Sequence, residues 1–189
     1  MQYLETLDTR LFLFLNGKHN AFFDFVMYWF SDKLIWIPMY VVIAFFIVRH
    51  YKINGILILL CIALVIAICD QTASHLIKNA VQRLRPSHEP ALAGLVHLSK
   101  AGPGGLYGFV SSHTANAFGL ATILYFVLDD RFSVLKYWLF IWAALVSYSR
   151  IYNGVHYPGD VLVAIALGAL IGWMISKLYR LIEKKQFLS

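Results

Sequence analysis

Long apolar runs with almost no charged residues follow one another along the chain, and this limits it to a membrane fold. They cover residues 34–48, 53–69, 109–128, 133–149 and 161–175. Runs of this kind indicate α-helices that cross a bilayer. Lipid offers no hydrogen-bond partners, and in a helix the backbone N–H and C=O groups bond to one another. With 60% hydrophobic and 14% charged residues, the composition leaves no room for a separate soluble domain. The sequence therefore predicts an all-α, polytopic membrane helix bundle with about five transmembrane helices.

The first thirty residues have a different pattern, in which aromatic and charged residues alternate. The polar stretch 16–20 divides this segment into two pieces, and neither is long enough to span a membrane. They are predicted to be interfacial amphipathic helices. Glu5, Asp8 and Arg10 interrupt the apolar core that a cleaved signal peptide needs, so none is expected. We expect one domain over residues 1–189, with interfacial helices in 1–30 and a helical core in 34–182.

Ionisable and other polar residues gather at four of the predicted helix ends. They are Lys78 and Arg85 after the second run, Ser111, Ser112 and His113 at the start of the third, Arg150 after the fourth, and His156 and Asp160 before the fifth. With five spans, these four ends lie on one side of the bilayer. Such residues are costly near lipid and mark functional sites. The sequence therefore predicts one polar site layer.

The distribution of the other basic residues predicts which side that layer faces. The opposite side carries Arg49, Lys52, Arg131, Lys136, Lys177, Arg180, Lys184 and Lys185. The site side carries only Arg10, Lys18 and Lys33 besides the basic residues counted near the site, which are Lys78, Arg83, Arg85, Lys100 and Arg150. Because cytoplasmic loops are enriched in Lys and Arg, the site is expected to face the periplasm or cell exterior of a bacterial-type inner membrane. The net charge of +6 is then explained without nucleic acid as a partner.

The segment Ser149–Asp160 carries an arginine, a histidine and an aspartate within twelve residues. A histidine held by a carboxylate is a well-oriented base or nucleophile, and a guanidinium presents donors that suit a phosphate. This combination predicts chemistry on a phosphate group.

The two other groups have simpler alternatives. On a helix that continues to Arg85, Lys78 and Arg85 would share one face, about 10 Å apart, but they are also typical of basic side chains that reach for the interface. The two serines before His113 are either helix caps or part of an anion site. The imidazole favours the anion site, since a cap does not need it.

Some features stay open. Residues 87–108 form a glycine- and proline-containing loop whose length favours a function. Asp70 either contributes to a polar pocket or makes a structural hydrogen bond, and contacts of His75, His88, Glu89 and His97 with a head group are undecided. Cys61 and Cys69 lie about 12 Å apart along one helix, too far to bridge, and are expected to pack in the core.

Three motifs of the chain resemble, in order and spacing, the three-part signature of the type 2 phosphatidic acid phosphatase family. They are Lys78-x6-Arg85-Pro86, Ser111-Ser112-His113 and Ser149-Arg150-x5-His156-x3-Asp160. Ser112 replaces the family's usual glycine. The resemblance implies that His156 is the nucleophile that forms a phosphohistidine, that Asp160 orients it, and that His113 is the general acid. Lys78, Arg85, Ser111, Arg150 and the backbone N–H groups of Ser112 and His113 would hold the phosphoryl oxygens.

The expected activity is that of a metal-independent lipid phosphatase without a cofactor. Three cationic side chains supply the positive charge, and the sequence lacks the carboxylate cluster that magnesium favours. Candidate substrates are undecaprenyl diphosphate, ranked first by family analogy, lipid A phosphates and phosphatidylglycerophosphate. The alternative is a lipid flippase or small-anion transporter that uses Lys78, Arg85 and Arg150 as a binding ring. It is disfavoured because 117–128 and 161–175 contain almost no polar residues. The oligomeric state stays open.

Overall fold

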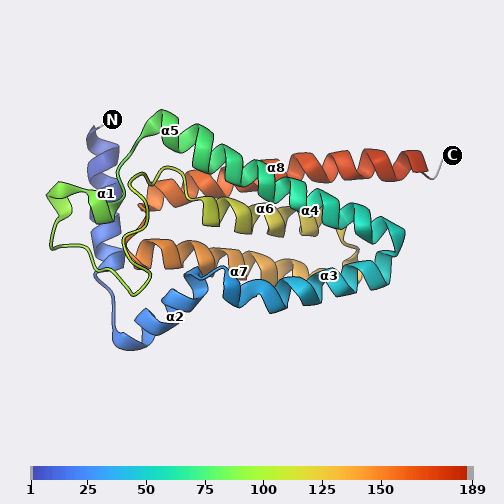
Figure 1. The fold of residues 1–189 in the computed structure, drawn as a ribbon, viewed down its shortest axis with the longest axis horizontal. Coiled ribbons are helices and arrows are strands. Elements are labelled where there is room, and N and C mark those ends of the chain that lie inside the picture. Colours follow the sequence, from blue (N-terminus) through green and yellow to red (C-terminus); the bar gives the residue numbers. More distant parts are fainter. Residues whose placement is uncertain (1, 187–189) are drawn as a thin grey trace.

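The computed structural model of the protein describes residues 2–186 and shows a bundle of long helices with two N-terminal helices at one end (Figure 1). The helices are α1 (Gln2–Asn16), α2 (Ala21–Ser31), α3 (Ile37–Tyr51), α4 (Ile53–Gln71), α5 (Lys78–Val81), α6 (Ser112–Val127), α7 (Ser133–Tyr152) and α8 (Pro158–Gln186). Of the predicted domain, Met1, residues 187–189 and the side chains of Gln2, Lys185 and Gln186 lie outside the described part. The prediction of an all-α polytopic bundle is confirmed.

Four segments are long and apolar enough to cross a membrane. They are Leu34–Tyr51, Ile53–Val81, Asp130–Tyr152 and Pro158–Lys184. The remaining predicted span is α6, which has 16 residues and lies among the long helices in Figure 1. At 1.5 Å per residue it is about 24 Å long, and protein surrounds it, so it needs less apolar length than a helix that faces lipid.

Helix α6 is the centre of the bundle and packs against α4, α7 and α8. Its contact with α8 depends on small residues. A Cβ atom at Gly172 of α8 would lie 2.6 Å from the carbonyl oxygen of Gly119 in α6. Only glycine permits this approach, and small residues that let two helix backbones come close are a common basis of helix packing in membranes.

The two N-terminal helices pack on the bundle. The ring of Phe12 in α1 is fully buried and lies edge-on to Tyr157, with centroids 5.5 Å apart. The end of α2 is tied to the end of α7, where the side-chain amide of Asn153 donates to the carbonyl of Met27 at 3.1 Å. The predicted helices in 1–30 are therefore present, and they contribute to the structure around the site. Their position at the membrane interface stays a prediction.

The second membrane helix ends earlier than the sequence predicted. After α4 comes a π-helical turn, Thr72–Ile77, and then α5 stops at Val81, because Gln82 has a left-handed backbone with φ 51°. Arg85 follows in extended conformation, and its N–H donates to the carbonyl of Leu106 at 3.0 Å. The prediction that Lys78 and Arg85 share one helix face was therefore wrong. Arg85 belongs to the long loop.

Helices α7 and α8 extend further than predicted. The fourth span was expected to end at residue 149 and the fifth to begin at 161, whereas α7 continues to Tyr152 and α8 starts at Pro158. Arg150 and Asp160 therefore lie within helical turns. Only a short connection, which includes His156, joins the two helices.

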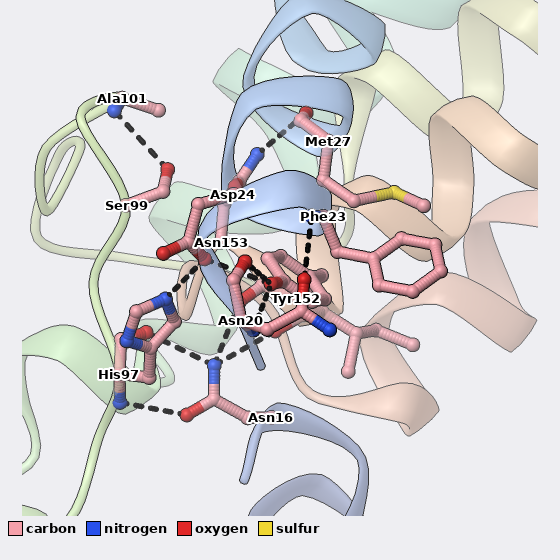
Figure 2. A network of polar contacts seen from close by, with 11 residues as sticks. Asn16, Asn20, Phe23, Asp24, Met27, His97, Ser99, Ala101, Tyr152 and Asn153 are labelled. Carbon is pink, nitrogen blue, oxygen red and sulfur yellow. Dashed lines mark hydrogen bonds and ion pairs between the residues drawn. The ribbon is translucent and has the colours of Figure 1, made fainter. Parts of the chain in front are cut away.

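A polar network ties the long loop to the N-terminal helices (Figure 2). Asp24 of α2 receives bonds from His97 Nε2 of the loop and from the hydroxyl of Tyr152, both at 2.7 Å. The side-chain amide of Asn16 donates to the carbonyls of His97 at 3.0 Å and Tyr152 at 2.8 Å. Burial alone would raise the pKa of Asp24, but the bonds from Tyr152 and His97 outweigh it and lower the pKa. His97, left open by the sequence, thus has a structural role here.

Candidate active site

The predicted site residues come together at the end of the bundle where α1, α5 and the long loop lie (Figure 1). Four segments contribute: the end of the second membrane helix with the loop after it, the start of α6, the end of α7, and the turn into α8. The backbone N–H of Ser111 contacts the carbonyl of Asp160 at 3.4 Å, which links two of these segments directly. The structure thus brings the four predicted segments to one end of the bundle, and the roles of their residues stay a prediction.

His156 and Asp160 form a buried pair. Nδ1 of His156 lies 3.6 Å from Oδ2 of Asp160, and the two side chains are 1% and 0% exposed. The same carboxylate oxygen accepts the backbone N–H of Tyr157 at 3.0 Å. Since Pro158 begins α8, Asp160 lies in its first turn, where the helix dipole favours a negative charge. These contacts fix the orientation of Asp160 and place it beside Nδ1 of His156, which has no hydrogen-bond partner among the described residues.

Positive charge surrounds His156. Burial, followed by the charges of Arg150, Arg85 and Lys78, holds the pKa of His156 well below its usual value. The imidazole is therefore neutral at physiological pH, as a nucleophile must be. These three cations are also the residues that were predicted from the sequence to bind the phosphate.

Arg150 is held at the end of α7 by a residue that sequence reasoning missed. Its side chain is 8% exposed, and Nη1 donates to the hydroxyl of Ser31 at the end of α2. Nε of Arg150 is buried and has no hydrogen-bond partner within residues 2–186. A guanidinium with an unused donor can bind the oxygens of a phosphate.

The start of α6 contains both a cap and a cation contact. The buried hydroxyl of Ser111 accepts the backbone N–H of Thr114 at 3.4 Å, so Ser111 caps the helix. The hydroxyl of Ser112 accepts a bond from Nζ of Lys78 at 3.4 Å. His113 follows in the first turn. The capping alternative is thus correct for Ser111, and its contact with phosphate stays a prediction.

Arg83 and Asp8 are also missed by the site prediction. Arg83 was counted only as a basic residue near the site, but its Nη1 donates to Asp160 Oδ1 at 2.8 Å and its Nη2 to Asp8 Oδ2 at 2.8 Å. The guanidinium also lies 4.0 Å from the ring centroid of Tyr157. Asp8 in α1 accepts the backbone N–H of Gly159 at 2.7 Å. The N-terminal helix therefore supports the carboxylate that faces His156.

A cavity of about 750 Å³ opens beside His113, between α3, α4, α6 and α7. Its walls are mostly apolar and include Ile43, Leu59, Ile62, Leu120 and Trp142. Binding cavities for small molecules fall in the same size range and are similarly apolar with a few polar groups. The cavity thus joins the histidine at the start of α6 to an apolar space inside the bundle.

Together these groups present a buried neutral histidine beside a carboxylate, a second histidine and several cations in one place. Such an arrangement suits transfer of a phosphoryl group, which needs positioning and positive charge around the equatorial oxygens. Among the described residues, no group of three or more His, Cys, Asp or Glu side chains is placed to hold a metal ion. The prediction of metal-independent turnover is left to experiment.

Comparison with known proteins identifies the family. The family model described as PAP2 superfamily matches residues 54–184. Lipid A 4'-phosphatase of Bacteroides thetaiotaomicron is 38% identical over 92% of this chain and 77% of that protein. Lipid A 4'-phosphatase of Porphyromonas gingivalis is 34% identical over 95% of this chain and 75% of that protein.

Solved structures agree. The crystal structure of Aquifex aeolicus LpxE has a TM-score of 0.67 and 27% identity and covers 90% of this chain and 95% of that one. A PAP2-type phosphatidylglycerolphosphate phosphatase from Bacillus subtilis has a TM-score of 0.70 at 22% identity, with 96% and 89% covered, which supports the fold. The chain therefore belongs to the PAP2 superfamily and is a multi-pass bacterial membrane lipid phosphatase of that type.

Proposed function

We propose that this enzyme removes a phosphate from a lipid A-type glycolipid through a phosphohistidine intermediate on His156. The observation that carries the mechanism is the buried pair of His156 and Asp160 with Arg150, Arg85 and Lys78 acting on the imidazole. The two lipid A 4'-phosphatases that align with nearly the whole chain support the substrate.

In the first step, Nε2 of His156 attacks phosphorus while Asp160 faces Nδ1 and stabilises the positive charge that develops on the ring. The bond between phosphorus and the lipid oxygen breaks, and His113 donates a proton to that oxygen. In the second step, His113 accepts a proton from water, the water oxygen attacks phosphorus, and the phosphorus–nitrogen bond breaks. Inorganic phosphate then leaves, and His156 is again neutral.

Lys78, Arg85 and Arg150 hold the phosphoryl oxygens in both steps. Their charges are fixed in place before the reaction, so they stabilise the transition state without reorganisation. Ser111, Ser112 and the first N–H groups of α6 face the same oxygens, since a helix N-terminus favours an anion.

The lipid tail fits the apolar cavity beside His113. A substrate whose phosphate lies between the two histidines places its leaving oxygen toward this cavity, and the bulk of the lipid stays within the bundle and the bilayer. Among the candidate substrates, family analogy had ranked undecaprenyl diphosphate first. The similarity to two lipid A 4'-phosphatases favours lipid A instead.

The site is proposed to face the periplasm. Basic residues concentrate at the opposite end of the bundle, in the α3–α4 turn, before α7 and along the end of α8 (Figure 1), as expected for a cytoplasmic side.

Phosphate release from a panel of substrates tests the proposal. Purified enzyme in detergent would be given a monophosphorylated lipid A, a prenyl diphosphate and phosphatidylglycerophosphate at equal surface concentration. We expect the highest kcat/KM with lipid A, and loss of its turnover in His156→Ala. A higher kcat/KM with the prenyl diphosphate would overturn the substrate assignment, and full turnover by His156→Ala would overturn the mechanism.

A further inference from the structure

The end of the cavity next to His113 carries polar side chains that the phosphate chemistry does not use. They are Asp32, Lys33, Asp70, Gln71 and Asn116. Asp32 has a local role, because its Oδ1 accepts the backbone N–H of Leu34 at 2.7 Å. The others line the same cavity as His113. In the proposed mechanism the alcohol part of the substrate leaves toward this cavity, so these side chains can contact the leaving group.

Asn116 has the clearest signal of a missing partner. It follows His113 by three residues on α6, so the two side chains lie on one face of the helix and both line the cavity. Oδ1 of Asn116 is buried and has no hydrogen-bond partner in the described part of the chain. A buried acceptor without a partner is costly, and in a native structure it calls for an explanation such as water or a ligand.

Asp70 provides a second acceptor from α4. Its Oδ1 accepts a bond from the hydroxyl of Ser74 at 3.4 Å. A carboxylate can accept several hydrogen bonds, so this bond leaves capacity for a ligand. Aspartate is also rare within membrane helices and is usually retained for function. The sequence left the role of Asp70 open, and the structure places it on the cavity wall.

The charged and amide side chains that line this cavity come from the segment after α2, the end of α4 and the start of α6. From Ala67 to Leu59 the residues of α4 that line the cavity are apolar, over about 12 Å of helix rise. A ligand that fits this arrangement has hydroxyl or amide donors close to the reacting oxygen and an apolar chain further away. A sugar that carries an acyl chain has both, whereas diacylglycerol has no donors next to its phosphate.

We propose that Asn116 and Asp70 form a leaving-group subsite that binds the hydroxyl or amide donors of a carbohydrate and so selects phosphorylated glycolipids. This inference rests on the proposed function and deepens it. The two acceptors discriminate by hydrogen bonding, because a site built to pair with donors rejects an analogue that lacks them.

The test compares two substrates in the same micelles: a monophosphorylated, acylated glucosamine disaccharide and phosphatidic acid. Asn116→Leu keeps the branched shape of the side chain and removes the acceptor. We expect kcat/KM for the glycolipid to fall by about 5- to 100-fold, mainly through KM, and the preference over phosphatidic acid to fall by a similar factor. Asp70→Asn should shift the preference in the same direction, and it keeps the helix intact if Asn116→Leu proves unstable.

Thr122→Val is the matched control. Oγ1 of Thr122 is also buried without a partner, on the same helix, but Thr122 does not line the cavity. Both kcat/KM values should stay within about twofold.

Two outcomes separate the inference from the proposed function. If wild-type enzyme prefers the glycolipid but Asn116→Leu and Asp70→Asn lower both activities equally, the subsite is overturned and the glycolipid function stands. If wild-type enzyme prefers phosphatidic acid, the glycolipid function itself is overturned, and the subsite with it.

Discussion

Replacement of Arg83 by methionine tests whether the N-terminal helix supports the catalytic carboxylate. Arg83 is 24% exposed and donates to Asp160, which is 0% exposed, and to Asp8, each at 2.8 Å. Methionine keeps much of the side-chain volume and removes both bonds. Asp160 then keeps the backbone N–H of Tyr157 and the contact with His156, but loses its guanidinium partner.

The size of the effect follows from the bond to Asp160. A hydrogen bond to a charged group contributes about 1.5–3 kcal/mol. If this energy positions Asp160 in the transition state, its loss lowers kcat by about 10- to 150-fold. We expect a lower melting temperature as well, since a buried carboxylate that loses its partner is destabilising.

Phosphate release and thermal unfolding in detergent would measure both effects, with Asp8→Asn as the control. Asp8→Asn weakens the second bond of Arg83 but leaves the bond to Asp160, so its loss of kcat should be clearly smaller. Wild-type kcat in Arg83→Met would refute the reasoning. An equal loss in both variants would show instead that docking of α1 matters, and not the partner of Asp160.

Three further predictions concern orientation, metal and pH. For orientation, single cysteines would replace Lys100 or Ser133 in a variant that lacks Cys61 and Cys69. In cells stripped of their outer barrier, the cysteine at position 100 should react with a membrane-impermeant thiol reagent, and the one at position 133 should not. The reverse pattern would place the site in the cytoplasm. Turnover should persist in EDTA because side chains supply the positive charge, and a loss that magnesium restores would contradict this. Because the pKa of His156 is lowered, its imidazole becomes protonated only well below pH 6.5, so the acidic limb of the kcat/KM profile should lie below that value; a limb at or above it would contradict the charge arrangement.

The sequence predicted the bundle and the meeting of its polar residues because both follow from local patterns. Apolar runs give the membrane helices, and counting them places Lys78, His113, Arg150 and His156 on one side. The end of the second helix was predicted wrongly because nothing between residues 78 and 85 excludes a helix before Pro86. The break after Val81 depends on the π-helical turn and on pairing of Arg85 with Leu106 in the loop.

The supporting residues could not be found in this way. Arg83 and Asp160 are 77 residues apart in the chain, Arg83 and Asp8 are 75 apart, and Ser31 and Arg150 are 119 apart. The contacts of Asp8 and Ser31 depend on how α1 and α2 dock on the bundle, and an amphipathic pattern does not specify which polar side chain meets which partner. The contact of Arg83 with Asp160 depends on how the segment after α5 packs against the start of α8. The cavity between four helices is likewise a product of packing.

Trapping the phosphorylated enzyme is the most direct test of the central claim. Wild-type enzyme and the His156→Ala and His113→Ala variants would be mixed with a labelled lipid phosphate, quenched in alkaline denaturant and mapped by mass spectrometry. We expect a phosphate bound through nitrogen, stable to base and labile to acid, on His156 of the wild type, and none in His156→Ala. In His113→Ala turnover should fall by about 10²- to 10⁴-fold, and the adduct should still form on His156 with a substrate whose leaving group needs no proton. An adduct on His113 that persists in His156→Ala would show that the two histidines have the opposite roles.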